Sequence, residues 1–291
     1  MKLLPYLICV VAVGCSDVGA PADGDDPPND IVVAPERDLN SPGTDALLAQ
    51  MMADDAAHYQ AAVAAGVKFF PTSDGESFYA YWEPPGFDPA NDGVVLSLHG
   101  HGAFVSSGFS AWQPFVTPRR YAWVALQWWF GRDQTINDYY LPIEIYPAFQ
   151  IALAEQHLRT TDLLFEGFSR GSANSYGVAA IDNAQVSPMF ALAIANSGGM
   201  IPDFPPNADI IAGAFGAQPY AGQHWVLFCG GLDPDPDQSG CPGMANSEIW
   251  LESYGGIVDL FIQDPTAGHG GFHLNGNADR ALDVYDALRT P

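Results

Sequence analysis

Short apolar runs and amphipathic segments alternate along most of the chain. Runs rich in β-branched and aromatic residues are typical of buried strands. They cover residues 76–82, 93–99, 121–129, 161–166, 188–195, 224–230 and 257–262, and a further strand pattern begins near Val67. Helical patterns occupy residues 45–66, 141–158, 172–180 and 277–288. Strands that alternate with helices predict an α/β fold with a mainly parallel sheet and helices on both of its faces.

The N-terminus has the pattern of an export signal. Lys2 precedes an apolar run, residues 3–14, which is shorter than the ~20 residues of a membrane-spanning helix. The letters AVGC that end at Cys15 resemble a bacterial lipobox, in which this cysteine becomes the lipidated first residue. Cleavage after Ala20 is the alternative. The sequence thus predicts an extracytoplasmic protein that is either a membrane-anchored lipoprotein with signal peptide 1–14 or a secreted protein.

The cysteine count favours the lipoprotein. Cys9 leaves with the signal in either case, and a disulfide between Cys229 and Cys241 leaves Cys15 without a partner. Lipidation of Cys15 accounts for the odd cysteine.

Composition sets the remaining boundaries. Residues 15–43 are dense in Asp and Pro, which predicts a disordered tether, and residues 44–291 form the predicted domain. The whole chain is 48% hydrophobic, enough for a core, and its formal charge is −24. This charge repels nucleic acid and anionic membranes, so we expect no nucleic-acid partner and membrane contact only through the lipid anchor. We also expect a monomer, although the sequence does not fix the oligomeric state.

One pentapeptide carries nucleophile chemistry. The letters GFSRG at 167–171 follow a predicted strand and precede a predicted helix, the context of a nucleophile elbow. The flanking glycines permit the close approach that so tight a turn requires. Ser169 is therefore the predicted nucleophile.

A serine nucleophile needs a base and an acid farther along the chain. His269 lies in a glycine-rich loop after the last predicted strand and is the preferred base, with His273 as the fallback. Asp233 follows the strand at 224–230 and is the preferred acid. Its rivals are Asp235, Asp237 and Asp203. The Cys229–Cys241 disulfide is expected to hold the loop of the acid rigid.

These segments together resemble a known superfamily. VVLSLHGHGA, LFEGFSRGS, FALAIANSGGM, VLFCGGLD and AGHGGFH are similar to motifs of the α/β-hydrolase superfamily, in particular its exported esterases, which include feruloyl esterases and polyhydroxybutyrate depolymerases. The resemblance implies an α/β-hydrolase fold and a serine esterase that cleaves small or polymeric esters through an acyl-enzyme without a cofactor. It also implies that the backbone amides of His101 and Arg170 form the oxyanion hole.

Aromatic and basic residues near the predicted site have two interpretations each. Trp128 and Trp129 either form an aromatic wall for the substrate or belong to the core. Arg119, Arg120 and Arg132 either select an anionic group or are solvated surface residues, and the second is favoured.

Three alternatives to a serine esterase remain. A serine peptidase has the same fold and mechanism. His99 and His101 have a spacing that binds zinc, and His269 with His273 would complete such a site. A binding lipoprotein without turnover is the third.

Overall fold

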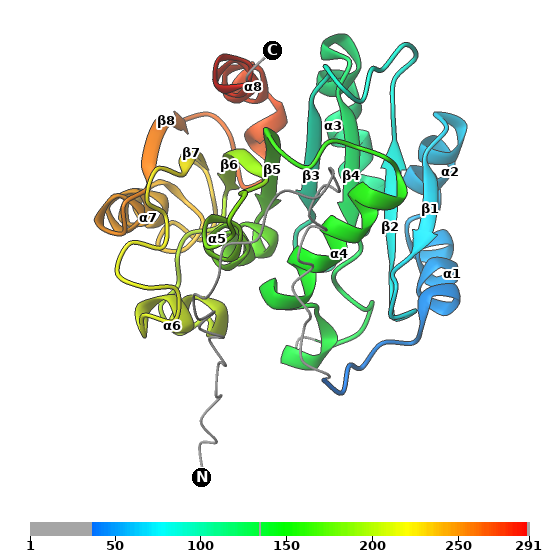
Figure 1. The fold of residues 1–291 in the computed structure, drawn as a ribbon, viewed down its shortest axis with the longest axis horizontal. Coiled ribbons are helices and arrows are strands. Elements are labelled where there is room, and N and C mark those ends of the chain that lie inside the picture. The colour runs from blue at the N-terminus through cyan, green and yellow to red at the C-terminus, as the bar shows by residue number, and fades with distance from the viewer. Residues whose placement is uncertain (1–36, 134, 290–291) are drawn as a thin grey trace, which may run out of the picture. The chain divides into compact units, whose positions relative to one another are not determined.

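An eight-stranded sheet organises the chain (Figure 1). The computed structural model describes residues 37–133 and 135–289. The strands are β1 (Lys68–Pro71), β2 (Phe78–Trp82), β3 (Val94–Leu98), β4 (Ala122–Leu126), β5 (Leu163–Phe168), β6 (Phe190–Asn196), β7 (His224–Gly230) and β8 (Ile257–Asp264). Their order across the sheet is β1-β2-β4-β3-β5-β6-β7-β8. β2 pairs antiparallel with β1 and β4, and all other pairs are parallel.

Helices cover the sheet and bury its central strands. They are α1 (Thr44–Asp54), α2 (Ala56–Ala64), α3 (Val105–Arg119), α4 (Pro142–Glu155), α5 (Arg170–Asn183), α6 (Pro205–Ile211), α7 (Cys241–Ser253) and α8 (Asn277–Leu288). α3 packs on β2, β3 and β4, and α5 packs on β5 and β6 with α4 and α6 at its sides (Figure 1). Every residue of β3 and β4 is buried, which explains why both read as continuous apolar runs rather than alternating ones.

The strand prediction is confirmed, and the helix prediction is incomplete. All seven predicted strands are present, and the pattern near Val67 corresponds to β1. The helix predicted at 45–66 is instead two helices, because Asp55 has non-helical backbone angles of φ −124° and ψ 39°. α3, α6 and α7 were not predicted. α3 contains Pro114 and Pro118, and burial of its aromatic face outweighs their poor helix propensity.

The end of the predicted tether contacts the domain. Arg37 forms an ion pair with Glu144 at 2.7 Å, and the Asn40 amide donates to the carbonyl of Asn137 at 2.8 Å. Arg37 lies seven residues before Thr44 and contacts Glu144 of α4. The part of the domain that the structure describes therefore begins at least seven residues before Thr44. The predicted signal peptide and Cys15 lie outside the described residues.

The strand order creates a crevice at one edge of the sheet. In the sheet, β3 lies between β4 and β5. The chain goes from β3 to β4 on one side and then returns to β5 on the other side of β3. Connections that leave neighbouring parallel strands in opposite directions open a crevice at their carboxyl ends, where ligands bind in such folds. Leu98 of β3 lies opposite Gly167 of β5, so the segments that follow both strands meet at this crevice. Among the described residues, no helix has the length and apolar character needed to cross a bilayer.

Candidate active site

Ser169 occupies a strained turn between β5 and α5. Its backbone angles are φ 54° and ψ −117°, which residues with a side chain rarely adopt. The turn is held by two backbone hydrogen bonds, from Ser169 N to Asn196 O at 2.8 Å and from Ala173 N to Ser169 O at 3.1 Å. This is the geometry of a nucleophile elbow, which presents its hydroxyl at the carboxyl edge of the sheet.

Glycines make room for this turn. A Cβ atom at Gly167 would lie 2.3 Å from the carbonyl oxygen of Gly171, and one at Gly171 would lie 2.5 Å from the oxygen of Leu98. A Cβ atom at Gly198 would lie 2.0 Å from the oxygen of Ser169. All three obstacles are backbone atoms, which cannot move aside. Both glycines of the pentapeptide are therefore required by packing, as the sequence predicted, and Gly198, which follows β6, is a third.

Ser169, His269 and Asp233 form one hydrogen-bonded chain. Ser169 Oγ lies 2.8 Å from His269 Nε2, and His269 Nδ1 lies 2.7 Å from Asp233 Oδ2. The Asp233 side chain is 1% exposed, whereas that of His269 is 35% exposed. An ionised carboxylate accepts only, so Nδ1 carries the imidazole proton and Nε2 is left to accept from the Ser169 hydroxyl.

Among the candidate acids, Asp233 is the one in contact with His269. Its second oxygen, Oδ1, accepts from the amide of Asp235 at 2.9 Å and from Ser239 Oγ at 2.8 Å. Asp235, Asp237 and Asp203 are exposed. Both Asp233 oxygens are therefore hydrogen-bonded, which fixes the carboxylate in the orientation that holds the imidazole.

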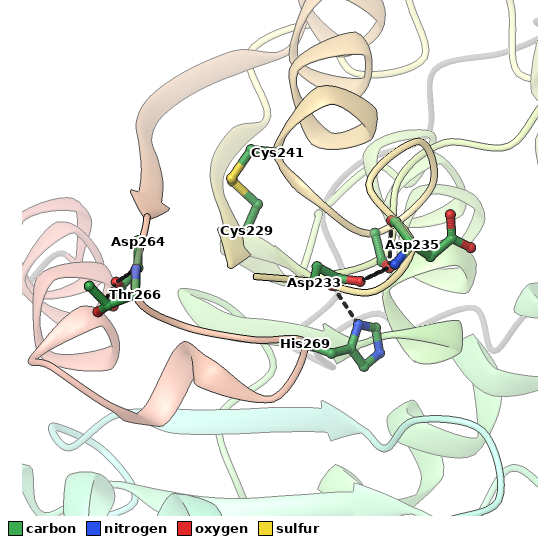
Figure 2. Close-up of a disulfide and its surroundings, with 8 residues drawn as sticks. Cys229, Asp233, Asp235, Cys241, Asp264, Thr266 and His269 are labelled. Carbon is green, nitrogen blue, oxygen red and sulfur yellow. Dashed lines mark hydrogen bonds and ion pairs between the residues drawn. A yellow bond between two sulfur atoms is a disulfide. The ribbon is translucent and has the colours of Figure 1, made fainter. Parts of the chain in front are cut away.

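The predicted disulfide closes the loop that contains Asp233 (Figure 2). Cys229 lies on β7 and Cys241 is the first residue of α7, so the bridge joins the two ends of the acid loop. In the figure the Asp233 side chain points from this loop toward His269.

Reduction of this disulfide is expected to lower both stability and activity. A bridge that closes a loop of this length stabilises the folded state by about 3 kcal/mol on the chain-entropy model. We expect a lower melting temperature and a lower kcat with dithiothreitol, and no effect of dithiothreitol on a Cys229→Ala/Cys241→Ala variant. An unchanged melting temperature and rate on reduction of the wild type would show that the bridge does not hold the acid loop.

The loop that carries His269 is anchored by Asp264, the last residue of β8. The Asp264 carboxylate accepts from the Nδ2 atoms of Asn275 and Asn277 and from both the amide and the hydroxyl of Thr266, at 2.8 to 2.9 Å. These donors hold the pKa of Asp264 well below its usual range. They tie the two ends of the loop together and so restrict where His269 lies. Asp264 was not among the residues predicted from the sequence.

The fallback base, His273, belongs to the core. Its ring packs against Trp112 and Phe115, with ring centroids 4.9 Å and 5.4 Å apart. Burial lowers the pKa of His273 to about 4, so the ring is neutral at pH 7. His273 makes no hydrogen bond to Ser169 in the described structure, and its place in the fold is that of a packing residue.

His101 and Arg170 line the same cavity as the nucleophile. A Cβ atom at Gly100 would lie 3.2 Å from the Cβ of Ser169, so the segment after β3 runs against the elbow. Arg170 is the first residue of α5, where a helix leaves its amides without intrahelical acceptors. In the described part of the chain, neither amide donates to another protein group.

Two adjoining cavities open at the site. The larger, of about 480 Å³, is lined by Ser169, His269 and Asp233 among others. The smaller, of about 190 Å³, lies beside it, and Arg170 and Phe204 line both. The nucleophile is therefore accessible to a ligand of small-molecule size.

The two tryptophans differ in position. Trp128 is fully buried, lines the smaller cavity and donates from Nε1 to the carbonyl of His99 at 2.9 Å. Trp129 lines neither cavity, because its ring packs against Phe104 and His101. Trp128 therefore lines a cavity beside the nucleophile, whereas Trp129 lines neither of these two cavities.

His99 and His101, the two histidines of the proposed zinc site, each contact another protein group through Nδ1. His99 is buried and its Nδ1 donates to the carbonyl of Gly100 at 2.8 Å, while His101 Nδ1 lies 2.5 Å from Tyr139 Oη. Within residues 37–133 and 135–289, no three His, Cys, Asp or Glu side chains are grouped as metal ligands would be.

Glu166 is a buried carboxylate beneath the site that the sequence analysis missed. It lies on β5, three residues before Ser169, and accepts hydrogen bonds from Ser97, Asn196 and Trp112 at 2.9 to 3.3 Å. It joins β3, β6 and α3 below the elbow. Burial raises the pKa of Glu166 to about 7 despite these donors. In the sequence, the sign of this buried carboxylate is a single glutamate within an otherwise apolar predicted strand.

This carboxylate is expected to make stability depend on pH. Because its folded pKa lies above the unfolded value, the folded state keeps a proton that the unfolded state releases, and this advantage is lost as pH rises toward 7. A Glu166→Gln variant lacks that titration. We expect the free energy of unfolding of wild type, relative to the variant, to fall by about 2 kcal/mol between pH 5 and 8 in urea titrations. Parallel pH profiles for the two proteins would contradict this assignment.

The fold is shared with solved esterases. The Bacillus cereus carboxylesterase is 16% identical with a TM-score of 0.52, over 80% of this chain and 99% of that chain. Esterase B from Lactobacillus rhamnosis is 15% identical with a TM-score of 0.52, over 84% and 95% of the two chains. An esterase from Pyrobaculum calidifontis is 11% identical with a TM-score of 0.56, over 83% and 92%.

These likenesses confirm the predicted fold. The neighbours are esterases with the α/β-hydrolase fold, and this chain has the same eight-stranded, mostly parallel sheet with flanking helices. No protein-family model matches the sequence, and no curated protein matches it. At identities this low, the likeness concerns the fold.

Proposed function

We propose that this chain is a serine hydrolase that cleaves carboxylic esters through an acyl-enzyme on Ser169. The observation that carries the proposal is the continuous hydrogen-bonded chain from Ser169 Oγ through His269 to the buried Asp233, at 2.8 and 2.7 Å. The esterase neighbours of the fold support the same chemistry at a coarser level.

In the first half of the proposed reaction, His269 Nε2 takes the proton of Ser169 Oγ as the oxygen attacks the ester carbonyl. The imidazolium that forms is stabilised by the Asp233 carboxylate, which stays ionised. The negative charge moves to the former carbonyl oxygen, and the amides of His101 and Arg170 donate to it. Each such donor lowers the barrier by about 3 kcal/mol. The tetrahedral intermediate then breaks its bond to the alcohol oxygen, which takes the proton from His269.

In the second half, a water molecule replaces the alcohol. His269 takes one proton from this water as the oxygen attacks the acyl carbon, and the collapse of the second intermediate returns that proton to Ser169 Oγ. The products are the alcohol and the carboxylic acid, and the enzyme is regenerated. The 35% exposure of the His269 side chain permits water to reach its Nε2 side.

The direct test is hydrolysis by the purified protein. We expect turnover of p-nitrophenyl acetate and butyrate that is unaffected by EDTA and abolished by a fluorophosphonate. Peptide p-nitroanilides serve as the second substrate class. Hydrolysis of the anilides but not the esters would favour the serine peptidase. Inhibition by EDTA would favour the zinc alternative, and no hydrolysis of either class would favour a binding protein.

We also propose that the protein acts outside the cytoplasm. The Cys229–Cys241 disulfide supports this location, since structural disulfides persist in oxidising compartments. Mass spectrometry of the N-terminal peptide from native membranes distinguishes a lipidated Cys15 from cleavage after Ala20.

A further inference from the structure

Arg170 differs from the other arginines in that it both lacks an ion pair with a described residue and lines the two cavities at the site; Arg132 and Arg280 also lack such a pair but line neither cavity. Five other arginines lie within 4 Å of a carboxylate: Arg37, Arg119, Arg120, Arg159 and Arg289. Arg119 and Arg120 are thus ion-paired, in agreement with their predicted surface role. Arg170 forms no ion pair with any described residue, although the chain contains 34 acidic side chains. A cation left unpaired beside a nucleophile is available to a ligand.

Tyr139 holds the Arg170 guanidinium at the smaller cavity. Its carbon Cζ lies 4.0 Å from the centre of the Tyr139 ring, and Nη1 donates to Tyr139 Oη at 3.1 Å. Tyr139 Oη in turn lies 2.5 Å from His101 Nδ1, within hydrogen-bond distance. The remaining guanidinium N–H groups have no acceptor in the described part of the chain. Stacking on Tyr139 and one hydrogen bond therefore fix the orientation of the Arg170 guanidinium, and its other N–H groups are available to donate to a ligand.

A second residue with an unpartnered polar atom lines the same cavity. Asn174 lies one helical turn after Arg170 on α5, is 1% exposed and lines the smaller cavity. Its Nδ2 donates to the carbonyl of Arg170 at 3.3 Å, while its Oδ1 has no hydrogen-bond partner among the described residues. A buried acceptor without a partner is costly, and a ligand hydroxyl would satisfy it. The other walls are apolar or aromatic: Trp128, Tyr140, Leu141, Phe204, Pro205 and Pro206.

We propose that this cavity is a subsite for a carboxylate on the ester substrate, bound by the Arg170 guanidinium, with Asn174 Oδ1 accepting from a hydroxyl on the same group. The inference rests on the proposed esterase function and adds its substrate class. Among possible ligand groups, a carboxylate is expected to bind most tightly here, because bidentate guanidinium–carboxylate hydrogen bonds are among the strongest in proteins. The formal charge of −24 opposes the approach of anions, so a preference for them requires a local cation such as this one.

The test compares charged and neutral esters matched in chain length. Monoethyl succinate, glutarate and adipate are compared with ethyl butyrate, valerate and hexanoate in a pH-stat, and O-butyrylglycolate with ethyl butyrate tests a carboxylate on the alcohol side. Monoethyl malate adds the hydroxyl. We expect kcat/KM for at least one charged ester to exceed that of its neutral partner by about tenfold or more. The readout is a ratio within one protein, so a general loss of activity cancels.

Arg170 variants assign the preference to this residue. Arg170→Gln is expected to abolish the ratio, and Arg170→Lys to keep part of it, because lysine retains the charge but loses the fork. The matched control is Arg280→Gln, which removes the same charge from an exposed position on α8 that lines neither cavity. Inhibition of the wild type by free glutarate more than by butyramide tests the subsite even if an Arg170 variant fails to fold.

The outcomes separate the two proposals. Hydrolysis of neutral esters without preference for charged ones would overturn the subsite and leave the esterase in place. A preference that persists in Arg170→Gln would overturn the assignment to Arg170. Absence of hydrolysis of every ester would overturn the proposed function itself.

Discussion

Replacement of Ser169 by alanine is expected to lower kcat/KM for p-nitrophenyl butyrate by about 10⁴-fold or more. The reason is that the alanine variant has no oxygen at the position 2.8 Å from His269 Nε2, so no acyl-enzyme forms. Alanine has the same Cβ atom as serine, so the strain at φ 54° stays unchanged and the fold is retained.

The control for this variant is Ser253→Ala, at an exposed position on α7. Circular dichroism and melting temperature should match the wild type for both variants, and activity should be lost for Ser169→Ala alone. Turnover of the Ser169→Ala protein within tenfold of wild type would refute the nucleophile assignment.

Replacement of His269 by alanine is expected to have an effect as large, whereas His273→Ala should affect stability instead. His269 bridges Ser169 and Asp233, so its loss removes both the base and the acid of the cycle. His273 is packed between aromatic rings, and truncation there leaves a cavity that costs about 2–4 kcal/mol of stability.

The two histidine variants are compared by kcat/KM and by urea denaturation. We expect a fall of about 10⁴-fold or more in kcat/KM for His269→Ala, with a free energy of unfolding near that of wild type. For His273→Ala we expect a lower free energy of unfolding than for wild type. Its kcat/KM should lie within tenfold of the wild-type value at a temperature where the variant is folded. The reverse pattern would mean that the imidazole at 273 is the base.

Local sequence patterns were sufficient to predict the strands and the elbow. Strands such as β3 and β4 are buried on both faces, so their apolar runs stand out without any knowledge of their neighbours. The elbow is equally local, since Gly167 and Gly171 are required by contacts within the turn and with the adjacent strand. The preferred base and acid lie where the chain order of the fold requires them.

Features that depend on distant contacts were not predictable. α3 contains two prolines and forms because its buried face packs on the sheet. Trp128 and Trp129 are neighbours in sequence, and only the arrangement of the loops determines which one faces a cavity. Asp264 and Glu166 support the site through partners from other strands and loops, which no local pattern shows.

Mapping of a covalent adduct gives the most direct test that Ser169 is the nucleophile. The protein is incubated with a fluorophosphonate, digested and sequenced by mass spectrometry. We expect one phosphonyl group per chain, on Ser169, and no adduct in the His269→Ala protein over the same time. Full labelling of another serine, or no labelling of a folded protein, would contradict that assignment.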